Sequence, residues 1–145
     1  WGMIALLSTI SIVKMSDTGA YTFGRLFGKH KLAPRLSPGK TIEGLIGGLV
    51  TAVVTALIWP LVLIPMMLPQ AAAPSLIGWF LCGLMIAIAG VVGDLAESLL
   101  KRDMRCKDSG RWIPGLGGFL DILDSLLFAA PVAFCCWTVG LVGPA

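Results

Sequence analysis

Charged residues are scarce in this sequence. They make up 13% of its 145 residues, whereas an average soluble domain contains about 25%. Three long apolar runs, residues 42–64, 76–100 and 119–142, carry charge only near one end. Each run is long enough to cross a bilayer as a helix, which takes about 20 residues. This distribution excludes an ordinary water-soluble domain and indicates an integral membrane protein.

Side chains typical of zinc sites, disulfides and nucleophilic catalysis are scarce as well. The four cysteines include no Cys-x-x-Cys pair, and three of them lie in apolar runs, so we expect neither a disulfide nor a zinc site. The only histidine, His30, is assigned no role, and no Ser/His/Asp set is visible. A net charge of only +3 argues against a nucleic-acid-binding protein, because such proteins carry an extended basic surface.

The charges that are present predict a topology. A shorter apolar segment, residues 2–15, precedes the three long ones. The connection 65–75 carries no charge, whereas the connections 16–41 and 101–118 hold ten of the eleven Lys and Arg residues. Four alternating crossings would place both charged connections on one side, and the positive-inside bias makes that side cytoplasmic. We therefore predict an all-α fold: a polytopic transmembrane helical bundle of about four membrane helices with two cytoplasmic polar loops.

The whole chain is predicted to form one transmembrane catalytic domain, residues 1–145. Because it opens on Trp1 rather than Met and its first apolar segment is short, we expect it to be the C-terminal part of a longer chain.

Carboxylates gather at the charged ends of two predicted helices. Asp94 lies near the end of the third apolar segment, and Asp121 and Asp124 lie on one face at the start of the fourth. Acids at membrane depth cost on the order of 3 kcal/mol each unless they are paired or hydrated, and converging carboxylates repel one another. A divalent cation removes this repulsion, and magnesium prefers oxygen ligands of this kind. These three residues are our predicted metal ligands.

Asp94 shares its predicted helix face with Glu97, Ser98 and Lys101, because these residues follow at helical spacing. The alternative to metal binding is that the acids face water or pair with Lys101 and Arg102.

A second candidate site lies in residues 16–44, SDTGAYTFGRLFGKHKLAPRLSPGKTIEG, which combine glycines with polar and charged side chains. Glycines let the backbone approach a ligand, and exposed N–H groups together with Lys and Arg bind phosphates. The candidate binding residues here are Asp17, Tyr21, Lys40, Thr41 and Glu43. The alternative is a basic cytoplasmic loop that binds nothing.

The run SLLKRDMRCKDSGRWIPGLGGFLDILD, residues 98–124, resembles the signature of phosphatidate cytidylyltransferases, also called CDP-diacylglycerol synthases. The signature residues present here are Ser98, Lys101, Arg102, Lys107, Asp108, Pro114, Gly117, Gly118, Asp121 and Asp124. The stretches 17–29, 37–44 and 93–98 are similar to that family too. Two positions depart from its pattern: Leu116 stands where the family usually has His, and Ile122 where it usually has Arg.

The resemblance implies a membrane-embedded nucleotidyltransferase that condenses CTP with phosphatidate to give CDP-diacylglycerol and pyrophosphate in phospholipid biosynthesis. It implies magnesium on Asp94, Asp121 and Asp124, with Lys101 and Arg102 as further catalytic residues. The substrate-binding residues it implies are Asp17, Tyr21, Lys40, Thr41, Glu43, Ser98, Lys107 and Asp108. It is compatible with a second cation and with a homodimer, and it places the protein in the inner membrane of a bacterium with the active site facing the cytoplasm.

Three alternatives stay open. A related CTP-dependent enzyme would act on another lipid, as a CDP-archaeol synthase or a polyprenol kinase does. A cation-coupled transporter would carry polar residues near the middle of its helices, whereas the acids here cluster at one end, which favours chemistry at the membrane surface. The third alternative is an inactive relative, because Leu116 and Ile122 depart from the family pattern.

Overall fold

A computed structural model describes residues 1–34, 37–70, 75–103 and 119–143. Side chains are described for these residues except 38, 101–103 and 119–124. The structure is mostly helical, and its elements in chain order are α1 (Gly2–Phe27), β1 (Lys31–Ala33), β2 (Ser37–Thr41), α2 (Ile42–Ile58), η1 (Trp59–Leu63), α3 (Ile64–Met67), α4 (Leu76–Asp103) and α5 (Phe119–Thr138).

The three long apolar runs form helices at nearly the predicted positions. The run 42–64 becomes α2, η1 and α3, which follow one another without a break. In the described part of the chain, two segments are long and apolar enough to cross a membrane, Ile42–Met67 and Leu76–Leu100, and α5 contributes a shorter apolar stretch, Ser125–Thr138. The larger number of four crossings, and the side on which the loops lie, stay predictions.

The stretch 16–41 differs from the predicted loop. Helix α1 continues to Phe27, and an antiparallel hairpin, β1 with β2, fills most of the remainder. The hydroxyls of Thr18 and Thr22 donate to the carbonyl oxygens of Lys14 and Thr18, at 2.8 and 2.7 Å. The hydroxyls of Thr18 and Thr22 thus find their hydrogen-bond partners within the helix itself.

Glycines let α1 and α2 pack closely. A Cβ atom added to Gly48 would lie 3.0 Å from both the Ala20 Cβ and the Ser16 carbonyl oxygen. The Ser16 hydroxyl also donates to the Gly48 carbonyl oxygen across this contact, at 3.3 Å. Small residues at helix contacts are the usual way in which membrane helices approach one another. The charged half of α1 is therefore fixed on the start of α2.

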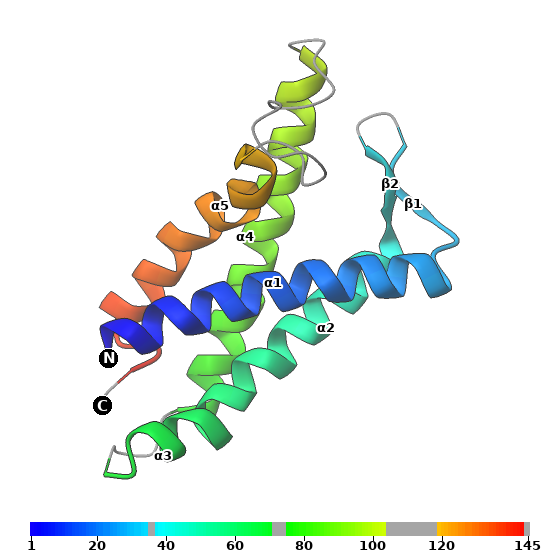
Figure 1. The fold of residues 1–145 in the computed structure, drawn as a ribbon. Coiled ribbons are helices and arrows are strands. Elements are labelled where there is room, and N and C mark those ends of the chain that lie inside the picture. The colour runs from blue at the N-terminus through cyan, green and yellow to red at the C-terminus, as the bar shows by residue number, and fades with distance from the viewer. Residues whose placement is uncertain (35–36, 71–74, 104–118, 144–145) are drawn as a thin grey trace.

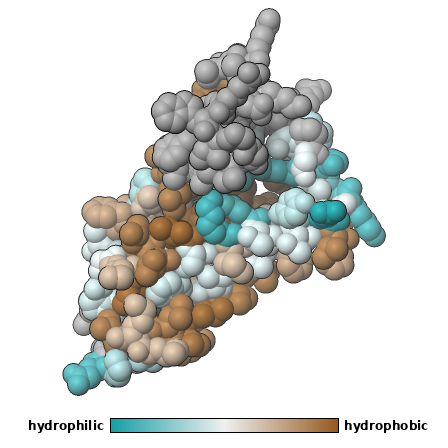
Figure 2. Space-filling model, viewed as in Figure 1, coloured by the Kyte–Doolittle hydropathy of each residue, from teal (hydrophilic) through white to brown (hydrophobic). Residues whose placement is uncertain are grey.

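The helices form two pairs. Antiparallel α1 and α2 cross α4 and α5, and the hairpin projects where α1 ends and α2 begins (Figure 1). The opposite end of the molecule holds α3, the start of α1 and the end of α5. Figure 2 shows hydrophilic residues gathered around the hairpin end and hydrophobic ones mainly along the helices away from it.

Large apolar side chains are exposed on all the long helices. Examples are Leu6 at 61%, Val54 at 52%, Ile77 at 74% and Phe134 at 69% exposed. Soluble monomers rarely expose extended apolar surface. This surface is therefore what a protein that faces lipid requires.

Candidate active site

One cavity lies where α1, the hairpin, α2, α4 and α5 meet. Its volume is about 510 Å³. The residues that line it are Asp17, Ala20, Tyr21, Gly24, Arg25, Leu32, Gly39, Lys40, Thr41, Gly44, Leu45, Val91, Asp94, Glu97, Ser98 and Ser125. The two groups of polar residues that the sequence singled out, one before Gly44 and one around Asp94, thus meet in a single site.

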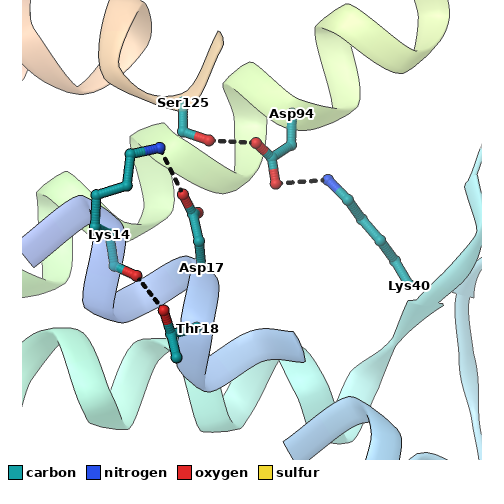
Figure 3. A network of polar contacts seen from close by, with 6 residues as sticks. All are labelled: Lys14, Asp17, Thr18, Lys40, Asp94 and Ser125. Atoms are coloured by element: carbon teal, nitrogen blue, oxygen red, sulfur yellow. Dashed lines mark hydrogen bonds and ion pairs between the residues drawn. The ribbon is translucent and has the colours of Figure 1, made fainter. Parts of the chain in front are cut away.

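Asp94 contacts the side chains of Lys40 and Ser125, which come from two other elements (Figure 3). Its Oδ2 lies 2.9 Å from the Nζ of Lys40, which comes from β2. Its Oδ1 accepts a hydrogen bond from the hydroxyl of Ser125 on α5. The Lys40 and Asp94 side chains are only 27% and 28% exposed, so the attraction between their charges is less screened than at an open surface. Asp94 therefore joins three elements that are distant in sequence.

Thr41 lines the cavity together with Gly24, Gly39 and Gly44, and it packs against Gly28. The Thr41 hydroxyl accepts the backbone N–H of Gly44 at 3.1 Å and so caps the N-terminus of α2. A Cβ on Gly28 would lie 2.1 Å from the Gly24 carbonyl oxygen and 2.8 Å from the Thr41 Cγ2. Only a residue without a side chain fits there. Thr41, predicted as a binding residue, lines the cavity and is also a structural cap.

The wall formed by α1 presents residues four apart on one helix face. Asp17, Tyr21 and Arg25 all line the cavity. The Arg25 Nη1 donates to the Tyr21 hydroxyl at 3.1 Å, and the Lys14 Nζ lies 3.4 Å from Asp17 Oδ2. Asp17 and Tyr21 were predicted as binding residues, whereas Arg25, although it belongs to the same predicted stretch 16–44, was not selected. Its spacing from Tyr21 would have pointed to it if the helix had been foreseen.

Glu43 is the predicted binding residue that the structure does not bring to the cavity. Its Oε1 lies 2.7 Å from the Nδ1 of His30, and both of its carboxylate oxygens accept the His30 backbone N–H, at 3.3 and 3.2 Å. His30, to which the sequence assigned no role, is thus the partner of Glu43.

On α4, Ser98 lines the cavity as predicted, and its hydroxyl donates to the Asp94 carbonyl oxygen at 2.8 Å. Lys101 and Arg102 lie in the last turn of α4, but their side chains are outside the described residues. Lys107 and Asp108 lie outside the described residues altogether. Glu97 and Ser125 line the cavity as well, although neither was selected as a site residue.

Asp121 and Asp124 belong to the first turns of α5, and their side chains are outside the described part of the structure. Their location is nevertheless informative, because Ser125 directly follows Asp124 and its hydroxyl contacts Asp94. Position 121 is one helical turn before Ser125 and shares its face. The start of α5 therefore lies beside Asp94. Among the side chains that are described, no group of three or more His, Cys, Asp or Glu residues is arranged to hold a metal ion. The three-aspartate metal site stays a prediction.

The chain is similar to known proteins over most of its length. Residues 1–139 match the model of the cytidylyltransferase family. The chain is 42% identical over 133 residues to the phosphatidate cytidylyltransferases of Staphylococcus aureus strain COL and of Staphylococcus epidermidis strain ATCC 12228, covering 90% of this chain and 48% of each relative. It is 40% identical over 141 residues to the uncharacterized protein YnbB of Escherichia coli strain K12, covering 94% of this chain and 45% of that protein.

The chain thus spans about half the length of the relatives it matches. Since the family model covers nearly all of its residues, including every described residue that lines the cavity, the chain belongs to the cytidylyltransferase family.

Proposed function

We propose that this chain carries the catalytic half of a membrane enzyme that transfers CMP from CTP to phosphatidate. The observation that carries the proposal is the polar cavity at the ends of apolar helices, where Asp94 contacts Lys40 and Ser125. Family membership supports it, and so do two relatives that are named phosphatidate cytidylyltransferases.

The cavity suits the meeting of a soluble and a lipid substrate. Its volume of about 510 Å³ is within the roughly 300–1,000 Å³ of small-molecule sites. Its polar walls come from α1, β2 and the end of α4, whereas the bodies of the same helices expose apolar side chains. CTP would enter from water, and the lipid would present its phosphate from the membrane.

In the proposed reaction, an oxygen of the phosphatidate phosphate attacks the α-phosphorus of CTP. One P–O bond forms, the bond between the α- and β-phosphates breaks, and pyrophosphate leaves with the electron pair. The products are CDP-diacylglycerol and pyrophosphate. A phosphate monoester is already ionised near neutral pH, so the attack requires no general base.

The residues of the cavity have roles that follow from their charge. Both substrates are polyanions, and Lys40 and Arg25 supply positive charge to hold phosphates in reacting geometry. Asp17 and Tyr21 are the proposed contacts to the nucleoside. Lys101, Arg102, Lys107 and Asp108 complete the proposed set of catalytic and phosphate-binding residues.

Magnesium is the cation that this site would take. Asp94 already accepts a positively charged group, the Lys40 ammonium, together with a hydroxyl donor, so its carboxylate is suited to a hard cation. Asp94, Asp121 and Asp124 would hold the ion, and the Ser98 hydroxyl donates to the Asp94 carbonyl oxygen. When bound, magnesium would reduce the repulsion between the substrates and stabilise charge on the leaving group.

We place the protein in the inner membrane of a bacterium with the cavity open to the cytoplasm, because CTP is a cytoplasmic nucleotide and the basic residues gather at the cavity end. Pairing of two copies is compatible with this arrangement.

Labelled CTP tests the proposal. The protein as the cell makes it, purified in detergent micelles with phosphatidate, should move the α-phosphate label of CTP into lipid and release one pyrophosphate per label. Omitting magnesium should stop the reaction. Absence of α-label in lipid under all these conditions would contradict the proposal.

The fate of the label also separates the alternatives. A polyprenol kinase would transfer only the γ-phosphate label. A CDP-archaeol synthase would transfer the α-label to an archaeal ether lipid in preference to phosphatidate. A cation-coupled transporter would leave both labels on the nucleotide.

A further inference from the structure

The base of the β1–β2 hairpin is closed by a cluster of contacts between His30 and the start of α2. The Glu43 carboxylate accepts from the His30 ring and from its backbone N–H, at 2.7, 3.2 and 3.3 Å. The backbone N–H of Ile42 donates to the His30 carbonyl oxygen at 2.9 Å. We call these contacts between His30 and residues 42–43 the hairpin clasp.

We propose that His30 and Glu43 are positioning residues, which fix the hairpin so that Lys40 is held at Asp94. The catalytic consequence of this inference rests on the proposed function, whereas its structural content does not. Neither His30 nor Glu43 is among the residues that line the cavity, so they would act through Lys40 rather than by touching substrate.

The hairpin needs such support because it is small. Its strands are three and five residues long, and the pairs are Lys31 with Thr41 and Ala33 with Ser37, with an irregularity between them. An isolated two-stranded hairpin is marginally stable in water. The clasp adds charge-assisted hydrogen bonds at the end of the hairpin from which Lys40 extends.

The contact between Lys40 and Asp94 depends on where the hairpin places the backbone of Lys40. It directly precedes Thr41, which pairs with Lys31, and it lies three residues before Glu43 of the clasp. From there its four-carbon side chain must reach Asp94, 54 residues away in sequence. Ordering a long lysine side chain costs conformational entropy. A hairpin base that moved would add backbone disorder to this cost and would break the contact with Asp94.

The clasp lies near the surface, so we expect it to position the hairpin rather than to hold the helices together. The His30 side chain is 74% exposed and the Glu43 side chain 25%. The start of α2 is held by the Thr41 hydroxyl cap and by the bond from the Ile42 N–H to the His30 backbone carbonyl, and neither contact uses the side chain of His30 or Glu43. Loss of the clasp should therefore loosen the hairpin while the helices stay packed.

Zero-length cross-linking tests the structural content directly. A water-soluble carbodiimide joins a lysine amine to a carboxylate in direct contact, with loss of water, and mass spectrometry of the digested protein would quantify the Lys40–Asp94 linkage. We expect Glu43→Ala to lower this yield at least about threefold, because the pair is coupled to the clasp. His30→Asn, which keeps a donor near the position of Nδ1, should retain most of it.

Lys31→Gln is the matched control. Lys31 is an exposed residue of the same hairpin, next to His30, and its substitution should leave the yield unchanged. Equal Lys40–Asp94 yields in Glu43→Ala and the native protein, with the thermal unfolding midpoint preserved, would overturn the proposal. If Glu43→Ala unfolds, the same comparison is made with Glu43→Gln, which keeps one carbonyl acceptor for the His30 N–H.

A double-mutant cycle tests the catalytic consequence. Glu43→Ala should lower kcat/KM for CTP about tenfold in the native background and less than about twofold in Lys40→Met, because both changes remove the same interaction. The KM for phosphatidate should not change. Equal losses in both backgrounds would show that the clasp does not act through Lys40. A protein that transfers no CMP at all would refute the proposed function, and the cross-link would still decide the role of the clasp.

Discussion

The two ends of the helix bundle are built differently. At the hairpin end, α4 and α5 meet through a carboxylate, a hydroxyl and an ammonium group, those of Asp94, Ser125 and Lys40. At the other end they meet through aromatic rings. The Trp137 ring packs edge-on against Trp79 with centroids 5.9 Å apart, and it lies 6.2 Å from Trp1. The same helices thus carry a polar site at one end and an apolar core at the other.

This difference suggests a division of labour. Trp79 is fully buried at 0% exposure, and burial of large aromatic side chains is a strong source of stability. The Asp94–Lys40 pair keeps about a quarter of each side chain exposed and faces a cavity, so it contributes less to stability. Substitutions at the hairpin end should therefore change the reaction, whereas substitutions at the aromatic end should change folding.

Asp121→Asn should have the largest effect at the hairpin end. It removes a proposed magnesium ligand, so magnesium-dependent CMP transfer should fall on the order of 1,000-fold. Membrane insertion should be unchanged, because the substitution removes charge near the end of an apolar helix. Transfer is measured with α-labelled CTP and insertion by extraction of membranes at high pH. Full activity in this variant would rule out Asp121 as a metal ligand.

Lys40→Met should come next. It removes the ammonium beside Asp94, and kcat/KM for CTP should fall roughly 10- to 100-fold, the value of one or two hydrogen bonds to a charged group. The control is Lys31→Met, which changes an exposed lysine of the same hairpin and should retain activity. Steady-state kinetics with varied CTP would separate the two. Similar losses in both variants would mean that kcat/KM depends on the overall positive charge of the hairpin and not on the contact between Lys40 and Asp94.

Ser125→Ala should have a smaller effect. It removes one hydroxyl donor to Asp94, and we expect the rate of CMP transfer to fall about tenfold or less. Thr138→Ala is matched to it, since the Thr138 hydroxyl donates at 3.0 Å to the carbonyl oxygen of Phe134 in the same helix, far from the cavity. An unchanged rate in Ser125→Ala would show that this contact is structural only.

Trp79→Ala should have the smallest effect on catalysis and a large one on stability. Removing a fully buried indole leaves a cavity, and the free energy of unfolding should fall by about 3–5 kcal/mol. The specific rate of CMP transfer per folded molecule should be unchanged. Phe80→Ala, at a neighbouring side chain that is 44% exposed, should unfold at nearly the native denaturant concentration. A lower specific rate in Trp79→Ala would contradict the assignment of catalysis to the hairpin end and of stability to the aromatic end.

The apolar helices could be predicted from sequence because their lengths are set by the bilayer. The predicted runs 42–64 and 76–100 correspond to the segments Ile42–Met67 and Leu76–Leu100. The distribution of charge also predicted that Asp94 and the residues before Gly44 lie on the same side of the membrane, but not that they line one cavity.

The second half of α1 could not be predicted in this way. Ser16, Thr18, Gly19 and Thr22 have a loop-like composition, and their close packing on the glycines of α2 is a tertiary contact that no local pattern predicts. Without that helix, the placement of Arg25 beside Tyr21 was hidden.

The hairpin was missed for a similar reason. Its strands are too short to show a period of alternation, and the contact of His30 with Glu43 joins residues that no local pattern connects. Ser125 was overlooked because a serine next to two aspartates carries little signal of its own, until the packing of α5 on α4 brings its hydroxyl to Asp94.

The most direct test of the account is CMP transfer by Asp94→Asn. Asparagine keeps the shape of the side chain and an acceptor for Ser125, but it removes the charge that pairs with Lys40. With the variant present in membranes at the native level, we expect transfer of the α-phosphate of CTP to phosphatidate to fall on the order of 100- to 1,000-fold. Transfer at the native rate would contradict the assignment of this cavity as the active site.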